Sequence, residues 1–300
     1  MLIERLQRDS RVDLTYRPVK TEEQLASLVR DAEILVTRYH NHVSAEVLDR
    51  ANALRLIVQG TSGTDNIDSD AAARRNVPVL SIPGENANAV AEWVIGTSIT
   101  LTRTLPWYDA SMRRGEWIRE DCATRRELNS HQMGIIGIGR VGTRVARLAA
   151  AFGIRPIAYD PYVEAEEIGR RGATKVQSLE ELLVKTDILT LHVPLTGETR
   201  RMIGARQIDL LPEGAIVLNA CRGPVVDTHA LLDRLERGHL GGVALDVFEE
   251  EPPRNTRWPD NPRLLLCPHI AGCSRESKQS IALLIYEKIS EYLDLIGTRD

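Results

Sequence analysis

The stretch MGIIGIGRVG (residues 133–142) joins an apolar run to a helical pattern, and it spaces Gly137, Gly139 and Gly142 as G-x-G-x-x-G. In such a turn the first glycine permits a tight bend, the second lets backbone N–H groups approach a pyrophosphate, and the third lets helix and strand pack closely. The helix N-terminus adds partial positive charge facing the anion. The stretch therefore predicts a dinucleotide-binding turn.

A carboxylate completes this pattern. Asp160 ends the next apolar run, in the segment Ile157-Ala158-Tyr159-Asp160-Pro161. An acid about twenty residues after the glycines accepts hydrogen bonds from the adenosine ribose and repels a 2′-phosphate, so it favours NAD over NADP. A glycine triplet alone is also common in ordinary turns, but strand, helix and acid together predict an NAD site.

Short apolar runs alternate with amphipathic stretches on both sides of the turn, which is typical of βα units around a parallel sheet. After residue 133 we expect strands at 134–138, 156–159, 188–192, 215–219, 242–247 and 264–267, and helices at 141–152, 179–185, 205–211 and 228–236. Several of these strands are apolar throughout, as strands covered by helices on both faces are. The predicted fold class is α/β, with a Rossmann-type doubly wound parallel sheet.

The first hundred residues form a separate block. We expect strands at 32–37 and 54–58, helices at 21–30, 44–51 and 109–115, and one long helix at 87–105. A final amphipathic helix at 274–296 is expected to return to this block. The predicted domains are therefore 1–86, the first part of a smaller discontinuous flavodoxin-like substrate domain; 87–270, the NAD-binding domain; and 271–300, the return helix.

Composition excludes several other classes of protein. The chain has 300 residues, of which 43% are hydrophobic and 27% charged, and its net charge is −4, so it is neither disordered nor strongly basic. The pair Arg170–Arg171 is read as part of a solvated face. No run is long and apolar enough for a membrane span, and the start lacks a signal-peptide pattern. No metal-ligand spacing relates the four cysteines, Cys122, Cys221, Cys267 and Cys273, so we expect free thiols in a cytoplasmic protein and no metal. From the charge balance and the lack of a membrane span, we expect neither a nucleic-acid nor a membrane partner.

Three polar residues follow expected strands, where parallel sheets expose functional groups. They are Arg222, Glu251 and His269. Each has an ordinary alternative: a surface charge, one member of an acidic run, and a buried histidine bonded to backbone. Beside a nicotinamide they make chemical sense, because histidine exchanges a proton near neutral pH, a carboxylate fixes its tautomer, and an arginine binds a substrate carboxylate.

From residue 57 to about 290 the chain resembles the D-2-hydroxyacid dehydrogenases, most closely their 3-phosphoglycerate-dehydrogenase-like branch. The similar segments occur in the family's order: GIIGIGRVG, AYDP, LHVPLTGETR, LNACRGPVVD, GGVALDVFEEEP and CPHIAG. The resemblance implies a two-domain fold and NAD-linked oxidoreduction of a small D-2-hydroxy acid or 2-keto acid. It also implies a homodimer formed through the cofactor domain, with residues 87–117 contributing.

The resemblance also assigns roles to individual residues. His269 matches the general acid/base, Glu251 its partner, and Arg222 the carboxylate anchor. Asp246 matches the residue that holds the nicotinamide carboxamide. The remaining cofactor matches are Arg140 and Val141 at the pyrophosphate, Asp160 at the ribose, and Pro194, Thr199, Ala220, Cys221 and Gly272 along the cleft. The implied substrate contacts are Arg38, Ser62, Gly63 and Asn86.

The chain departs from the family pattern at two places. Gln59 stands where phosphoglycerate enzymes often carry arginine, which weakens the case for a phosphorylated substrate, although Arg38 matches an arginine that can meet a distal phosphate. The start, from Leu2 to Leu6, resembles the family's first helix, so the usual first strand of the smaller sheet is missing. We therefore expect that domain to be less stable than its relatives.

Two other functions remain open on sequence. One is an NAD(H)-responsive interaction protein, because the resemblance extends to C-terminal-binding-protein corepressors. The other is a damaged paralogue, because of the short start. Arg222, Glu251 and His269 together favour turnover.

Overall fold

The computed structural model describes residues 1–38, 41–119, 126–254 and 257–297. The chain forms two compact units: Met1–Asn86 with Cys273–Asp300, and Ala87–Gly272. The first boundary lies where the sequence predicted it, whereas the second lies two residues later, after Gly272 instead of residue 270. Within the described residues no helix is long and apolar enough to cross a membrane.

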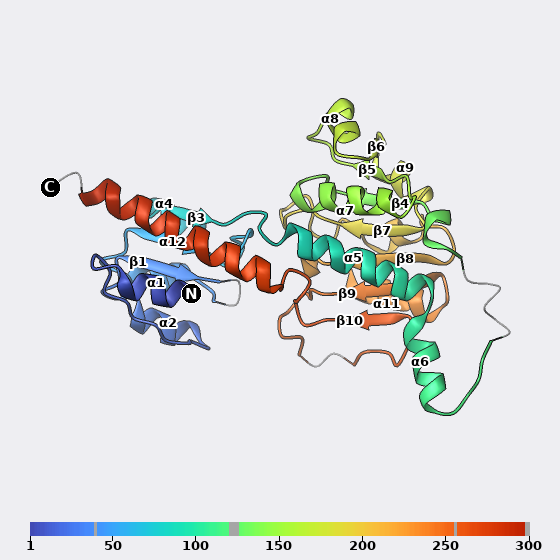
Figure 1. Cartoon of the computed structure of the whole chain (residues 1–300), viewed down its shortest axis with the longest axis horizontal. Helices are drawn as coiled ribbons and strands as arrows, with labels where there is room; N and C mark the ends of the chain where they lie inside the picture. The colour runs from blue at the N-terminus through green and yellow to red at the C-terminus, as the bar shows by residue number, and fades with distance from the viewer. Residues whose placement is uncertain (39–40, 120–125, 255–256, 298–300) are drawn as a thin grey trace. The chain divides into compact units, whose positions relative to one another are not determined.

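The larger unit is built on a parallel seven-stranded sheet (Figure 1). Its strand order is β10-β9-β8-β7-β4-β5-β6. The strands are β4 (Met133–Ile136), β5 (Ile157–Tyr159), β6 (Thr174–Lys175), β7 (Ile188–Leu191), β8 (Ala215–Asn219), β9 (Leu240–Leu245) and β10 (Leu264–Leu266). The chain fills the sheet from β4 to β6 and then restarts at β7 on the other side of β4. This change of direction is the switch point at which doubly wound sheets bind ligands.

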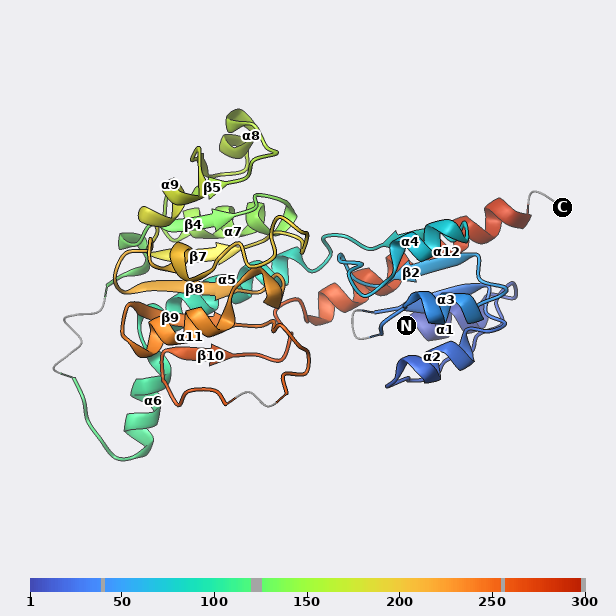
Figure 2. The ribbon, with the colours of Figure 1, turned by 180° about the vertical axis from the view of Figure 1, so that it is seen from behind.

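Helices cover both faces of this sheet. Its helices are α5 (Ala87–Thr102), α6 (Leu105–Arg113), α7 (Arg140–Ala151), α8 (Ala165–Arg170), α9 (Leu179–Val184), α10 (Ala205–Ile208) and α11 (Thr228–Glu236), with 3₁₀ turns η2 (Leu128–Ser130) and η3 (Gly223–Val225). Side chains of β4 alternate between the layers, Ile135 packing with α5 and α7 and Ile136 with α9, α10 and α11. Figures 1 and 2 show these two layers from opposite sides. The apolar strands are therefore buried on both faces, as the sequence predicted.

The smaller unit has a parallel three-stranded sheet in the order β1-β2-β3. Its elements are α1 (Leu2–Arg8), α2 (Glu22–Leu28), β1 (Ile34–Thr37), α3 (Ala45–Arg50), β2 (Leu56–Gln59), α4 (Ser69–Arg74), β3 (Val79–Ser81) and α12 (Arg275–Gly297). Residues from α2, α3 and α4 pack on one face, and residues from α1 and α12 pack on the other. Residues 12–20 form no strand. The return of α12 to this unit therefore places residues from both ends of the chain in one core.

The structure corrects the bounds of several predicted helices. The helix expected at 109–115 is part of α6, and the helix expected at 205–211 ends at Ile208. Residues 87–105 do not form a single helix, because α5 ends at Thr102 and α6 begins at Leu105. Thr104 has φ +49°, in the left-handed region, and Pro106 occupies the first turn of α6. Proline has no backbone N–H to donate to the carbonyl four residues earlier, here that of Thr102, and its ring clashes with that carbonyl, which explains the break at this point.

Candidate active site

The glycine-rich turn lies at the carboxyl end of β4. Gly137 has φ +85°, and a Cβ atom there would lie 2.6 Å from the carbonyl oxygen of His192. A Cβ atom on Gly142 would overlap the carbonyl of Gly137. At Gly139, by contrast, no atom of the described residues other than Gly139 and its two chain neighbours lies within 4 Å of that position. Gly137 and Gly142 are therefore required by packing, whereas Gly139 leaves open space beside the turn.

This turn fits a dinucleotide. The twelve-residue helix α7 begins after Gly139, and no side chain caps it. Asp160 is fixed beside the turn, because one of its carboxylate oxygens accepts the Ile138 N–H at 3.0 Å and the other accepts the Tyr162 N–H at 3.0 Å. Open space, an uncapped helix N-terminus and a fixed carboxylate match a pyrophosphate and an adenosine ribose. Arg140 and Val141 open α7, so their backbone lies at this position.

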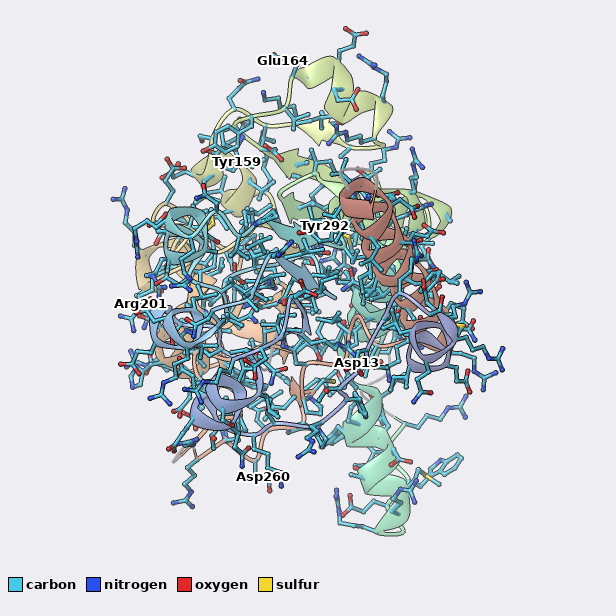
Figure 3. The ribbon with its side chains drawn as sticks, turned by 90° about the vertical axis from the view of Figure 1, so that its left-hand side faces the viewer. Asp13, Tyr159, Glu164, Arg201, Asp260 and Tyr292 are labelled. Atoms are coloured by element: carbon cyan, nitrogen blue, oxygen red, sulfur yellow. The ribbon has the colours of Figure 1, made fainter. Side chains whose placement is uncertain are left out.

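The loops after β5 and β7 flank the turn, because β4 lies between these strands. In the second loop the Thr199 hydroxyl donates to the Pro194 carbonyl oxygen at 2.6 Å. The Tyr162 hydroxyl donates to Glu198 at 2.7 Å and so joins the two loops. Figure 3 labels Tyr159 and Glu164, which lie before and after the loop that carries Tyr162. Neither Tyr162 nor Glu198 was predicted, since their contact depends on strand order.

A histidine and a carboxylate form the polar centre of the larger unit. Nδ1 of His269 lies 2.6 Å from Oε2 of Glu251, and the other oxygen of Glu251 accepts the Phe248 N–H at 3.1 Å. Both side chains of the pair are slightly more than a quarter exposed. Glu251 follows β9 and His269 follows β10, which are neighbouring strands. The structure thus brings together two residues separated by 18 positions.

The charge state of Glu251 follows from its surroundings. Burial alone raises the pKa of a carboxyl group, but the hydrogen bonds from His269 and Phe248 and the positive charge of Arg222 lower it more, so the pKa of Glu251 lies below its usual value of 4.5. Glu251 is therefore ionised at neutral pH and accepts the N–H of the His269 ring.

Arg222 is positioned by residues of its own loop. Its guanidinium donates to the Cys221 carbonyl oxygen at 2.7 Å, and the Asn219 side chain donates to the Arg222 carbonyl oxygen at 3.0 Å. The Asn219 oxygen accepts the N–H of Cys221 at 3.1 Å, and Ala220 lies between these two residues. Asn219 is buried at the end of β8 and was not predicted as a site residue. The sequence signal that could have identified Asn219 is a polar residue at the end of an apolar strand.

Asp246 holds the loop that carries His269. Its side chain is 1% exposed, and its two oxygens accept the N–H groups of Ile270 at 2.7 Å and Ala271 at 2.8 Å. Its carbonyl oxygen accepts the His269 N–H at 2.8 Å. His269 has φ +55°, in the left-handed region, which costs energy for a residue with a Cβ. These bonds stabilise that backbone conformation up to Gly272, the last residue of the unit.

The four predicted substrate contacts lie in the smaller unit. Arg38 follows β1, and its carbonyl oxygen accepts from Asn66 at 3.1 Å. The Ser62 hydroxyl accepts the Gly84 N–H at 3.1 Å, and the Gly63 carbonyl oxygen accepts from Gln59 at 3.1 Å. Asn86 is the last residue before the larger unit. Their roles as substrate contacts remain predictions.

The cysteines occupy different environments. Cys221 is buried and its thiol donates to Asn219 Oδ1 at 3.1 Å, Cys267 is partly buried, and Cys273 is exposed. Cys122 lies outside the described residues. Burial raises the pKa of the Cys221 thiol to about 11. Cys221 is therefore protonated at neutral pH.

A doubly wound sheet with this turn at its switch point defines a Rossmann-type domain of the NAD-binding class. Residues 95–271 match the family described as "D-isomer specific 2-hydroxyacid dehydrogenase, NAD binding domain". The chain belongs to this family, and its cofactor is NAD.

Relatives place the chain in the phosphoglycerate-dehydrogenase-like branch of the family. It is 37% identical over 278 residues to the D-3-phosphoglycerate dehydrogenase of Methanocaldococcus jannaschii, covering 91% of this chain and 52% of the relative. It is 38% identical over 278 residues to the enzyme of that name from Escherichia coli, covering 91% and 67%. The chain thus spans about half to two thirds of the length of these relatives.

A solved structure shows the same fold. The D-lactate dehydrogenase of Aquifex aeolicus, complexed with NAD and lactic acid, matches with a TM-score of 0.83 and 29% identity over 94% of this chain and 87% of that one.

Proposed function

We propose that the protein interconverts a small D-2-hydroxy acid and its 2-keto acid by hydride exchange with NAD(H). The 2.6 Å hydrogen bond between His269 and Glu251 carries this proposal. It pairs a proton-exchanging ring with an ionised carboxylate, and Arg222 lies close enough to lower the pKa of that carboxylate. Such a pair in an NAD-binding family supports a dehydrogenase.

Proton transfer is assigned to Nε2 of His269, because Nδ1 is bonded to Glu251. When bound, NAD⁺ supplies the acceptor for the hydride that leaves the substrate carbon. In that direction Nε2 accepts the hydroxyl proton, and the negative charge of Glu251 stabilises the resulting imidazolium. In the reverse direction the ring donates the proton to the carbonyl oxygen, which becomes the hydroxyl.

Substrate binding is assigned first to Arg222. A guanidinium can bind a carboxylate through two parallel hydrogen bonds and polarise the neighbouring carbonyl. One of its nitrogens donates to the Cys221 carbonyl oxygen, which fixes the direction of the side chain. Ser62, Gly63 and Asn86 are assigned as further substrate contacts. The residues assigned to cofactor binding are Asp246, Pro194, Thr199, Ala220, Cys221 and Gly272.

The test is NADH oxidation with a panel of 2-keto acids: glyoxylate, hydroxypyruvate, phosphohydroxypyruvate, pyruvate and larger homologues. Turnover is expected with one or two of them. His269→Ala should lower kcat by about 10²- to 10⁴-fold while NADH affinity stays within about twofold. His229→Ala is the matched control, because His229 is an exposed residue of α11. NADH binding without turnover on any member would favour an NAD-responsive interaction protein instead.

We propose an unphosphorylated substrate. Gln59 is fully buried, and its amide nitrogen lies within hydrogen-bonding distance of Thr61 at 2.9 Å, Gly63 at 3.1 Å and Asn66 at 2.8 Å, so it orders its own loop. We assign Arg38 to the end of the substrate farthest from its carboxylate. Preference for hydroxypyruvate over phosphohydroxypyruvate supports the proposal. A preference for the phosphorylated acid contradicts it, and loss of that preference in Arg38→Ala would assign the phosphate to Arg38.

We also propose a homodimer formed through the larger unit. On and after α6, Leu105, Met112 and Trp117 are exposed by 48%, 53% and 75%. Large exposed apolar side chains clustered along one segment are typical of interfaces. Sedimentation should give about twice the chain mass of 33.5 kDa, whereas a mass near 33.5 kDa contradicts the dimer.

A further inference from the structure

The backbone of Ile138 is held on both sides, at its N–H in the Gly137–Ile138 peptide and at its carbonyl in the Ile138–Gly139 peptide. Its N–H donates to Asp160 at 3.0 Å, and its carbonyl oxygen accepts from Nη1 of Arg171 at 2.7 Å and from the Thr143 hydroxyl at 3.2 Å. Ile138 is fully buried. The direction of these two peptides sets the course of the backbone into Gly139 and the first turn of α7, where the pyrophosphate is expected.

Arg171 differs from its neighbour Arg170 in what it contacts. Nε of Arg171 donates to Glu167 at 2.7 Å, and its side chain is 30% exposed. The Arg170 side chain is 66% exposed and pairs only with glutamates of its own helix among the ion pairs of the described residues. Arg171 is therefore anchored at one nitrogen and reaches the turn with another, so it is not simply part of a solvated face.

The fold brings Arg171 to the turn through the residue after it. Gly172 has φ +95°, and a Cβ atom there would lie 3.8 Å from Cβ of Ala146 on α7. The end of α8 thus lies against α7, whose N-terminus follows Gly139. Three elements far apart in sequence, the turn, the end of β5 and the end of α8, meet at the backbone of Ile138.

We propose that Arg171, anchored by Glu167, is a positioning residue that fixes the phosphate-binding turn and thereby strengthens NAD binding. Without it, the buried Ile138 carbonyl would keep only the 3.2 Å bond from Thr143 among the side-chain bonds of the described residues, and the Ile138–Gly139 peptide could rotate. Its positive charge also lies behind a turn that faces an anion, and this charge favours the pyrophosphate electrostatically. Asp160 and Arg171 hold the two peptides on either side of the Ile138 Cα, so their effects on affinity should be coupled.

The experiment measures the Kd of NADH and of ADP-ribose, which carries the pyrophosphate without nicotinamide, by fluorescence and calorimetry on the whole chain. Arg171→Ala should weaken both by roughly tenfold, the loss expected for one charge-assisted hydrogen bond. Arg170→Ala is the matched control and should change both by less than twofold. Because ADP-ribose binding needs no turnover, the result is independent of the proposed dehydrogenase activity.

Two further variants distinguish a positioning role in NAD binding from a general contribution to stability. Arg171→Lys keeps the charge and a donor and should recover most of the affinity. The double variant with Asp160→Ala should lose less than the product of the two single losses, because both act through the backbone of Ile138. An unchanged Kd in Arg171→Ala overturns the proposal. So does a loss that Arg171→Lys does not recover and that matches a fall in the apo Tm. If Arg171→Ala does not fold, Glu167→Gln gives the same test, with roughly threefold weaker binding expected.

Discussion

Gly223 lies against the backbone of Phe248 so closely that a Cβ atom on Gly223 would overlap the Phe248 carbonyl group. Gly223 follows Arg222, and the Phe248 N–H donates to Glu251 at 3.1 Å. The two loops that carry the proposed carboxylate anchor and the partner of His269 are therefore in direct backbone contact. This contact sets how close the positive charge of Arg222 comes to Glu251.

Gly223→Ala should separate these loops. Overpacking of this kind typically destabilises a protein by about 1–3 kcal/mol. Because the displaced groups are Arg222 and Glu251, we expect kcat/KM to fall by at least about tenfold while the Kd of NADH changes less. Steady-state kinetics and thermal unfolding check this. Gly169→Ala is the control, since no described atom lies near its Cβ position on exposed α8. Equal kinetics for the two variants would contradict the prediction.

Asp246→Asn should disturb His269 through the loop. The N–H groups of Ile270 and Ala271 each face a different carboxylate oxygen, so the NH₂ of an amide would face one of them. The buried donor left unsatisfied costs about 1–3 kcal/mol. We expect a kcat about tenfold lower and a lower Tm. Asp227→Asn is the matched control, because Asp227 caps α11 and asparagine caps helices equally well. Wild-type kcat in the Asp246 variant would show that the His269 conformation does not depend on these bonds.

Much of the larger unit could be predicted from sequence because its strands are buried on both faces and read as apolar runs. β8 and α11 have the predicted bounds. β6, by contrast, has only two residues, Thr174–Lys175, and neither is apolar, so no periodicity marks it. α8 and α4 have only six residues each, which is too short for a clear helical pattern.

The candidate site, too, could be predicted from sequence only in part. Strand ends and spacing indicated Arg222, Glu251 and His269 because functional groups collect at one edge of a parallel sheet. The roles of Asn219 and Arg171 depend on which backbone groups lie within hydrogen-bonding distance in three dimensions. No linear pattern contains that information. Side chains that orient a loop are consequently harder to predict than those that follow a strand.

Glu251→Gln should show a distinctive pH dependence. The pKa of Glu251 is lowered in the folded protein, so its contribution to stability is complete above the ordinary value of 4.5 and is lost as the pH falls through the folded-state pKa. The Tm difference between wild type and variant should therefore be largest near pH 7 and shrink below pH 4.5. Glu249→Gln, an exposed neighbour in the same acidic run, should show little difference. A gap that stays constant down to pH 3 would mean that Glu251 is not stabilised as an anion.

Cys221 should resist alkylation despite its place beside Arg222. With a pKa of about 11, only about one thousandth of the thiol is ionised at pH 8, and the thiolate is the reactive form. The exposed Cys273 should be modified by iodoacetamide first, as peptide mapping would reveal. Denatured protein, in which both sites are accessible, is the control. Modification of Cys221 as fast as Cys273 in the folded chain would contradict burial as the controlling factor.

The smaller unit should open more readily than the larger one. Its sheet has three strands against seven, and β1 has a partly exposed face, with Val36 37% exposed. β2 is its central strand, so it should be the best protected element of the unit. We expect amides of β2 to exchange at least about tenfold faster than those of β7 and β8. Hydrogen exchange followed by mass spectrometry measures this, and NADH should slow exchange around residues 137–142 as an internal check. Equal protection of β2 and β7 would show that the three-stranded sheet is as stable as the larger one.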